Sequence, residues 1–93
     1  LDESSFMELL TGFLSEAQAD IAKLDGLIAS DDFVKIAQIG HGIKGMAGNL
    51  RIANMQYAAK AMEAIAKEGK IKPEIRKKAI ELRQYLLELK QQI

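Results

Sequence analysis

The sequence predicts an all-α protein, an antiparallel up-down-up-down bundle of four helices. Apolar residues recur three and four positions apart over most of the 93 residues, which is the period of one face of a helix. Short segments containing glycine, proline, serine, aspartate or asparagine interrupt this pattern, and connections of two to five residues imply antiparallel neighbours. No segment has the strict alternation that predicts a half-buried strand.

The first half of the chain contains two of the predicted helices. The first covers about residues 5–28, where Ser5 and Glu8 have the spacing of an N-terminal capping box. Ser30, Asp31 and Asp32 then supply an N-cap and first-turn acids for a second helix, over about residues 31–48. The predicted core stripes are Phe6, Leu10, Phe13, Ala17, Ile21, Leu24 and Ile28 in the first helix, and Phe33, Ile36, Ile39, Ile43, Met46, Ala47 and Leu50 in the second.

The second half contains the other two helices, after a short connection at about residues 49–52. The third is predicted to stop near Gly69, because glycine commonly follows the end of a helix. Pro73 suits the first turn of the fourth helix. The core stripes are Ile52, Met55, Ala59, Met62 and Ile65 or Ala66 in the third helix, and Ile75, Ala79, Leu82, Leu86, Leu89 and Ile93 in the fourth.

Length and composition limit the functions that the chain can have. Residues 1–93 make a single domain, and because the first residue is Leu1 rather than methionine we expect a piece of a longer multidomain protein. Thirteen Lys or Arg balance thirteen Asp or Glu, so no overall field attracts nucleic acid. The absence of cysteine removes disulfides and thiolate chemistry. No apolar run approaches the ~20 residues of a membrane span, and we expect no direct membrane contact and a cytoplasmic location.

His41 is the only histidine, and its position in the second predicted helix singles it out. On a helical wheel it lies roughly 160° from Ile43, so it should face away from the core stripe. Gly45 and Gly48 follow on its own face and project no side chain, while Lys44 at i+3 places an ammonium beside the imidazole. Close approach of another molecule would explain these two glycines.

The neighbours of His41 narrow the chemistry that it can perform. A metal site needs several ligands, and the chain offers one histidine and no cysteine, so we expect no metal site. The serines and the threonine lie on the first helix or at its ends, without a nucleophile-elbow motif, and no glycine-rich loop follows a strand to hold nucleotide phosphates. Two interpretations remain, an incidental surface histidine and a nucleophile toward a phosphoryl group carried by another molecule.

The residues around His41 resemble a known family, the histidine-containing phosphotransfer (HPt) domains of multistep phosphorelays. That family typically has His-x-Leu/Ile-Lys-Gly, then Asn-Leu-Gly-Ala, and on the next helix Leu-x-x-x-Ala-x-x-Leu-Glu. The corresponding residues of this chain are His41-Gly42-Ile43-Lys44-Gly45, then Asn49-Leu50-Arg51-Ile52, then Met55, Ala59, Met62 and Glu63. Arg51 departs from the pattern, because the family usually has glycine there, and it makes the shape of that connection an open question.

The resemblance implies a role for each matching residue. His41 would accept a phosphoryl group on Nε2 from the aspartyl phosphate of a receiver domain and pass it to another receiver aspartate. Lys44 would stabilise the phosphoryl oxygens, and Glu63 would orient the imidazole by accepting a hydrogen bond from Nδ1. Lys67, one turn beyond Glu63, is a weaker candidate for contact with the phosphate or partner. The expected docking surface around His41 comprises Val34, Ala37, Gln38, Lys44, Gly45 and Gly48, and Lys67 is also expected to bind the partner.

The resemblance also implies which partners and cofactors to expect. The partners would be response-regulator receiver domains, which bring their own magnesium ion, so the chain would need no cofactor and no kinase activity of its own. We expect the isolated domain to be a monomer. We expect its parent protein to be a hybrid sensor kinase, a class that includes membrane-bound proteins. Two alternatives stay open: the phosphotransfer domain of a chemotaxis-type kinase, phosphorylated from ATP by a separate domain, and a helical interaction module without chemistry.

Overall fold

The computed structural model describes residues 2–69 and 71–93, and these residues form four helices. They are α1 (Glu3–Ala29), α2 (Phe33–Asn49), α3 (Ala53–Glu68) and α4 (Lys72–Gln91). The all-helical fold class and the number of helices predicted from the sequence are confirmed, and the described ranges contain no strand. Within the same two ranges, none of the helices combines the length and the apolar character needed to span a membrane.

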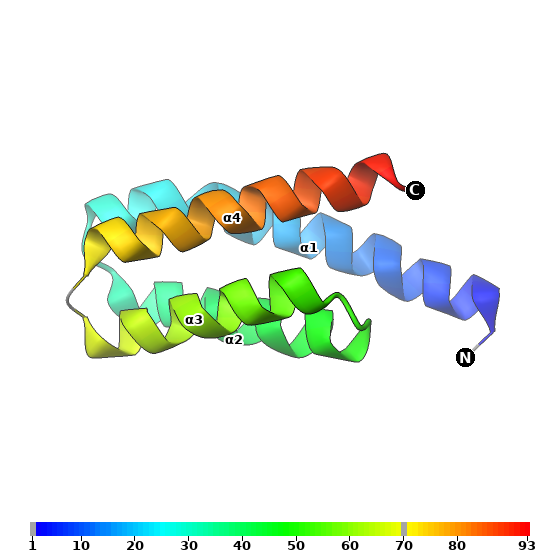
Figure 1. Ribbon diagram of the computed structural model, residues 1–93, viewed down its shortest axis with the longest axis horizontal. Helices are drawn as coiled ribbons and strands as arrows, with labels where there is room; N and C mark the ends of the chain where they lie inside the picture. Colours follow the sequence, from blue (N-terminus) through cyan, green and yellow to red (C-terminus); the bar gives the residue numbers. More distant parts are fainter. Residues whose placement is uncertain (1, 70) are drawn as a thin grey trace.

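The helices pack in two layers. Figure 1 shows that the chain turns back at each connection, with α1 and α4 in one layer and α2 and α3 in the other. Contacts join α2 to α3, α3 to α4, α1 to α4 and α1 to α2, so every helix has two neighbours. The N-terminal turns of α1 extend past the ends of the other three helices (Figure 1). The α2–α3 layer therefore has one face against α1 and α4 and one face open to solvent.

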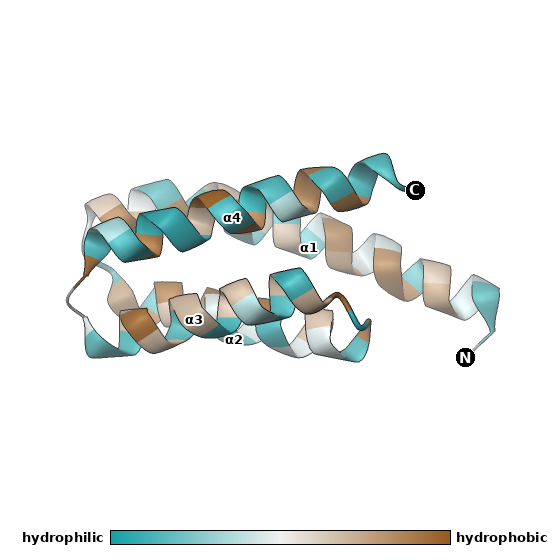
Figure 2. Cartoon of the chain, viewed as in Figure 1, coloured by the Kyte–Doolittle hydropathy of each residue, from teal (hydrophilic) through white to brown (hydrophobic). Residues whose placement is uncertain are grey.

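The core follows the predicted stripes over most of their length. Hydrophobic and hydrophilic residues alternate along each helix (Figure 2). The buried residues of each helix come from its predicted stripe, apart from Gly40 of α2 and Ala58 and Glu63 of α3. Two of the predicted stripes are wrong at one end: the first residue of the α1 stripe and the last residue of the α4 stripe are exposed. Phe6 is exposed because it lies on the turns of α1 that extend past the bundle, where no neighbouring helix can cover it, and Ile93 is exposed because it follows the end of α4.

The predicted N-caps of α1 and α2 need correction. Ser5 lies inside the first turn of α1, and Asp2 is the cap instead, since its carboxylate accepts a hydrogen bond from the Ser5 amide at 2.7 Å. Ser30 ends α1 rather than starting α2, and Asp31 follows it in the left-handed conformation at φ 59°. Asp32 is the N-cap of α2 and accepts from the Lys35 amide at 3.2 Å. The connection between α1 and α2 therefore includes Asp31 and Asp32, which were predicted to lie in the second helix.

Arg51 shapes the connection between α2 and α3. It adopts a left-handed conformation at φ 60°, and its amide donates to the Gly48 carbonyl at 3.2 Å. The next amide, that of Ile52, donates to the Ala47 carbonyl at 2.8 Å, which completes the turn that ends α2. Glycine adopts the left-handed conformation at the lowest energetic cost. This explains why the Asn-Leu-Gly-Ala pattern described above has glycine at this position. Arginine forms the same kind of turn here.

Gly40 allows α2 and α3 to approach closely next to the position of His41. A Cβ atom on Gly40 would lie 2.9 Å from the Ala59 carbonyl oxygen and 3.0 Å from the Glu63 amide nitrogen, both of which are backbone atoms. Gly40 therefore allows tight packing between these two helices. Gly42 has no heavy atom within 4 Å of its Cβ position, so helix packing gives no reason for it.

These two glycines make a matched pair for measuring the packing of α2 on α3. We expect Gly40→Ala to lower the free energy of unfolding by about 1–3 kcal/mol, because the added methyl group meets backbone that must move. Gly42→Ala should instead raise it by about 0.5–1 kcal/mol, since alanine favours the helix and meets nothing. Urea unfolding of both variants checks this. Equal effects of the two substitutions would contradict the close approach at Gly40.

Candidate functional site

His41 lies on the open face of α2. Its side chain is 71% exposed, whereas Ile43 on the opposite side of the helix is buried in the core. Cβ positions at Gly42 and Gly45 have no heavy atom within 4 Å, so the helix surface is open at these two positions near His41. The outward orientation expected from the helical wheel agrees with this geometry. A second molecule can reach the imidazole without displacing any residue of α2.

Glu63 of α3 lies directly behind the imidazole. Its side chain is only 7% exposed, and its Oε2 lies 3.1 Å from His41 Nδ1. The close approach of the helices at Gly40 makes this possible, because Gly40 lies next to His41 in the sequence and its Cβ position is 3.1 Å from Glu63 Cβ. Residues 22 positions apart in the chain thus form one pair.

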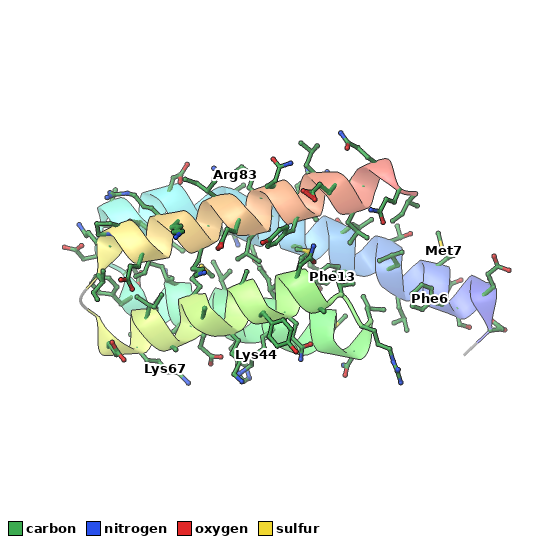
Figure 3. All side chains as sticks on the ribbon, in the orientation of Figure 1. Phe6, Met7, Phe13, Lys44, Lys67 and Arg83 are labelled. Atoms are coloured by element: carbon green, nitrogen blue, oxygen red, sulfur yellow. The ribbon has the colours of Figure 1, made fainter. Side chains whose placement is uncertain are left out.

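Two lysines complete a cluster around this carboxylate. Lys44 Nζ donates to Glu63 Oε1 at 2.7 Å, and Lys67 Nζ lies 3.1 Å from Oε2, the same oxygen that faces His41. Lys44 is 31% exposed and Lys67 is 67% exposed, so Lys44 is the more enclosed of the two cations. Both residues expected beside the phosphoryl group are therefore paired with Glu63 in this structure. Figure 3 shows Lys44 and Lys67 on the same outer side of the α2–α3 layer.

The lysines keep Glu63 ionised despite its burial. The hydrogen bond from Lys44, and then that from Lys67, lower the pKa of Glu63 to about 2. Burial acts in the opposite direction, and the hydrogen bond with His41 lowers the pKa further. Glu63 is therefore a carboxylate at neutral pH and only accepts hydrogen bonds.

An ionised Glu63 determines which nitrogen of His41 is free. Because the carboxylate has no hydrogen to donate, the 3.1 Å contact requires the hydrogen of the neutral imidazole to reside on Nδ1. Nε2 is then left with its lone pair on the exposed side of the ring. The arrangement presents a nucleophilic nitrogen to solvent, with a fixed ring orientation and two cations next to it.

The low pKa of Glu63 also predicts how stability depends on pH. A carboxyl group whose pKa falls on folding stabilises the protein above its unfolded value of about 4.5, and this contribution disappears as the pH falls toward 2. We expect the wild type to lose about 1–3 kcal/mol more than Glu63→Gln over this interval, since glutamine does not titrate. Urea unfolding at pH 6, 4 and 3 measures the difference. Parallel pH profiles of the two proteins would contradict the ionised cluster.

A groove adjoins His41 on one side of the site. Its volume is about 680 Å³, and its lining is mainly apolar. Its residues come from the beginning of α2 and the end of α3: Phe33, Val34, Ala37, Gln38, His41, Gly42, Glu63, Ala66, Lys67 and Gly69. The sequence predicted four of them as partner-binding, namely Val34, Ala37, Gln38 and Lys67. It missed Phe33, Gly42, Ala66 and Gly69, although Ala66 follows Glu63 at the i+3 spacing that places both on one face.

Gly48 is less open to solvent than the sequence predicts. A Cβ atom on Gly48 would lie 3.0 Å from Nε2 of the Gln56 side chain of α3. Gly48 is therefore covered in part by Gln56, because the turn at Arg51 brings the start of α3 back over the end of α2. Gly45 is exposed, as expected. Neither glycine lines the groove, which lies toward the opposite end of α2.

The described residues contain no cluster of three or more His, Cys, Asp or Glu side chains that could bind a metal ion. Glu63 uses its two oxygens for Lys44, Lys67 and His41. The chemistry that this arrangement supports is nucleophilic attack by Nε2 on an electrophile that another molecule carries.

A comparison with protein families agrees with this chemistry. The family model described as the Hpt domain matches residues 8–92, which includes His41, both lysines and Glu63. No curated protein and no solved structure matches the chain.

Proposed function

The chain belongs to the Hpt domain family, which has a histidine phosphotransfer role in phosphorelays and interacts with receiver domains, and we propose that His41 is the residue that carries the phosphoryl group. One observation supports this most strongly. The exposed imidazole has its Nδ1 next to a buried carboxylate that two lysines hold ionised, which leaves Nε2 as the nucleophile. The turning back of the chain at each connection supports the up-down-up-down arrangement that we propose for the bundle.

The proposed reaction forms one bond and breaks another without moving a proton. Nε2 of His41 attacks the phosphorus of a receiver's aspartyl phosphate, and the leaving group is the aspartate carboxylate, which takes the electron pair of the broken P–O bond. Nδ1 keeps its hydrogen, so the phosphorylated ring gains positive charge. Glu63 lies 3.1 Å from Nδ1 and stabilises that charge. Transfer to a second receiver aspartate reverses these steps.

Lys44 and Lys67 are proposed to stabilise the phosphoryl oxygens. Each ammonium has three donors, so Lys44 can keep its 2.7 Å bond to Glu63 and still donate to a phosphoryl oxygen. Lys67 is more exposed than Lys44, and its acceptor, Glu63 Oε2, also accepts from His41. Lys67 can therefore leave Glu63 and turn toward the phosphate at a lower cost in free energy, because that oxygen keeps a partner. The magnesium ion of the reaction is proposed to belong to the receiver.

The groove beside His41 is the proposed docking surface for the receiver. Val34 and Ala37 form part of its wall, and an apolar side chain of the receiver entering it would lie next to the imidazole. Gly42 and Gly45 leave room for the receiver's backbone near Nε2.

The experiment that tests this function follows phosphoryl transfer by intact mass. The wild-type chain is mixed with magnesium-loaded receiver domains that acetyl phosphate has phosphorylated. The proposal expects a gain of one phosphoryl group that is stable to alkali, labile to acid and located on the peptide that contains His41. If none of the receiver domains of the source organism transfers a phosphoryl group to the chain, the relay function is refuted and a binding module without chemistry becomes the better interpretation.

A further inference from the structure

The first turns of α1, here called the projecting turns (residues 2–9), extend beyond the rest of the bundle. α1 has 27 residues and the next longest helix, α4, has 20, which is a difference of roughly 10 Å at 1.5 Å per residue. Figure 1 shows that the connection between α2 and α3 and the C-terminal end of α4 lie at this same end of the bundle. The end of the bundle therefore has the shape of a step.

The projecting turns expose the face that the rest of α1 buries. Phe6, Met7 and Leu9 fall within an arc of roughly 160° on a helical wheel, and the same arc contains Phe13, which is buried in the core. The three side chains are between 38% and 44% exposed, and Figure 3 shows Phe6 and Met7 on these turns. Ile93 is exposed at the same end of the bundle. Exposed apolar side chains that are grouped in this way mark a surface for interaction.

The charges at this end of the bundle are of both signs and lie on different parts of the step. The projecting turns carry Asp2, Glu3 and Glu8, and the chain has no Lys or Arg before Lys23. Arg51 is exposed in the connection between α2 and α3, and it forms no ion pair with any carboxylate of residues 2–69 and 71–93. An acidic segment thus projects, and an unpaired cation lies at the recessed part of the same end.

We propose that this end of the bundle binds the same end of a second copy of the chain, related to the first by a two-fold axis. The projecting turns of each copy enter the step of the other, and the two fit in length because one projection sets both the step and the segment that fills it. The apolar faces of the two segments then cover each other. Their acidic tips approach Arg51 of the opposite copy.

The proposed dimer differs from the monomer that the sequence predicts, because the helical period does not show where α1 loses its neighbours. It leaves the site at His41 accessible, since the groove beside His41 lies at the beginning of α2 and the end of α3, away from the step. The inference therefore does not depend on the proposed function.

Sedimentation equilibrium over a range of concentrations tests the association. The contact is small, so the average mass should rise from 10.3 kDa at about 10 µM toward twice that value at about 1 mM. Phe6→Ser with Leu9→Ser should weaken the dimer at least about tenfold, because it removes apolar surface that the dimer buries. Ile71→Ser with Ile80→Ser removes two exposed apolar side chains away from the step, so this matched control should associate as the wild type does.

Arg51→Gly tests the contribution of charge. It removes the cation without straining the turn, because glycine readily adopts the left-handed conformation of this residue. The dimer should weaken about three- to tenfold at about 0.03 M salt and much less at about 0.5 M salt, where charges are screened. Arg76→Gln removes an exposed cation from the other end of α4 and should have no effect.

Three results would overturn the inference. A wild-type chain that stays at 10.3 kDa up to about 1 mM would show that the apolar end has a different partner. A dimer that survives the Phe6 and Leu9 substitutions, or that the control substitutions weaken equally, would form through another surface. A dimer that Arg51→Gly leaves unchanged at low salt would lack the proposed pairing of the acidic tips with Arg51. Circular dichroism of each variant checks that its helices are retained.

Discussion

Replacing His41 by glutamine is expected to abolish phosphoryl acceptance. Glutamine has a polar side chain that can still reach Glu63, but its amide nitrogen is not a nucleophile toward phosphorus. The side chain of His41 is 71% exposed, so the substitution should change the free energy of unfolding by no more than about 0.5 kcal/mol. Loss of transfer would then reflect the missing nitrogen rather than an unfolded protein.

Intact mass after mixing with a phosphorylated receiver measures the effect, with urea unfolding as the check on stability. Gln91→Ala is a suitable control, because Gln91 is exposed at the end of α4 and does not line the groove. It should keep the capacity to gain one phosphoryl group. If the His41→Gln protein gained an acid-labile group as the wild type does, another residue would have to be the acceptor and the proposed role of His41 would be wrong.

The helical period accounts for what the sequence could predict about the site. The angle between successive residues is nearly constant in a helix, so the outward direction of His41 and the position of Lys44 beside it follow from their spacing alone. The same argument places most of the core. It does not show where a helix loses its neighbours, which is why Phe6 and Ile93 were assigned to the core and are exposed.

Contacts between helices could not be derived from periodicity. The pair formed by His41 and Glu63 was expected only from the resemblance to the family, because the two residues lie on different helices and the wheel of one helix carries no information about the other. The shared use of Glu63 by Lys44 and Lys67 depends on how far α2 and α3 approach, and Gly40 sets that distance. The groove likewise exists only after the two helices pack.

The ends of helices were predicted least accurately for a related reason. Ser30, Asp31 and Asp32 are all residues that favour N-caps, and the sequence cannot show which of them ends one helix and which begins the next. In the structure Asp31 is left-handed, so the preceding helix ends before it and only Asp32 is available to cap α2. Arg51 also adopts this conformation, although arginine gives no signal for it in the sequence.

Glu63→Ala is expected to slow phosphoryl transfer about 10- to 100-fold, the loss usual when a group that orients a reactive imidazole is removed. Without the carboxylate, nothing on α3 fixes the hydrogen on Nδ1, and the ring distributes between its two tautomers and several orientations. The positive charge that develops on the phosphorylated ring also loses its partner. Glu63 is thus proposed to be a positioning residue, since it acts on the phosphoryl group through His41.

Two further variants distinguish positioning from a structural effect. Glu63→Gln keeps an oxygen that can accept from Nδ1 but loses the charge that attracts Lys44 and Lys67, so it should retain transfer within about tenfold of the wild type. Glu68→Ala removes an exposed carboxylate from the same helix and should have little effect. Nitrogen-15 NMR of the imidazole should show Nδ1–H in the wild type and a mixture of tautomers in Glu63→Ala. If Glu63→Ala kept both the wild-type transfer rate and the Nδ1–H tautomer, the carboxylate would have no role in orienting His41.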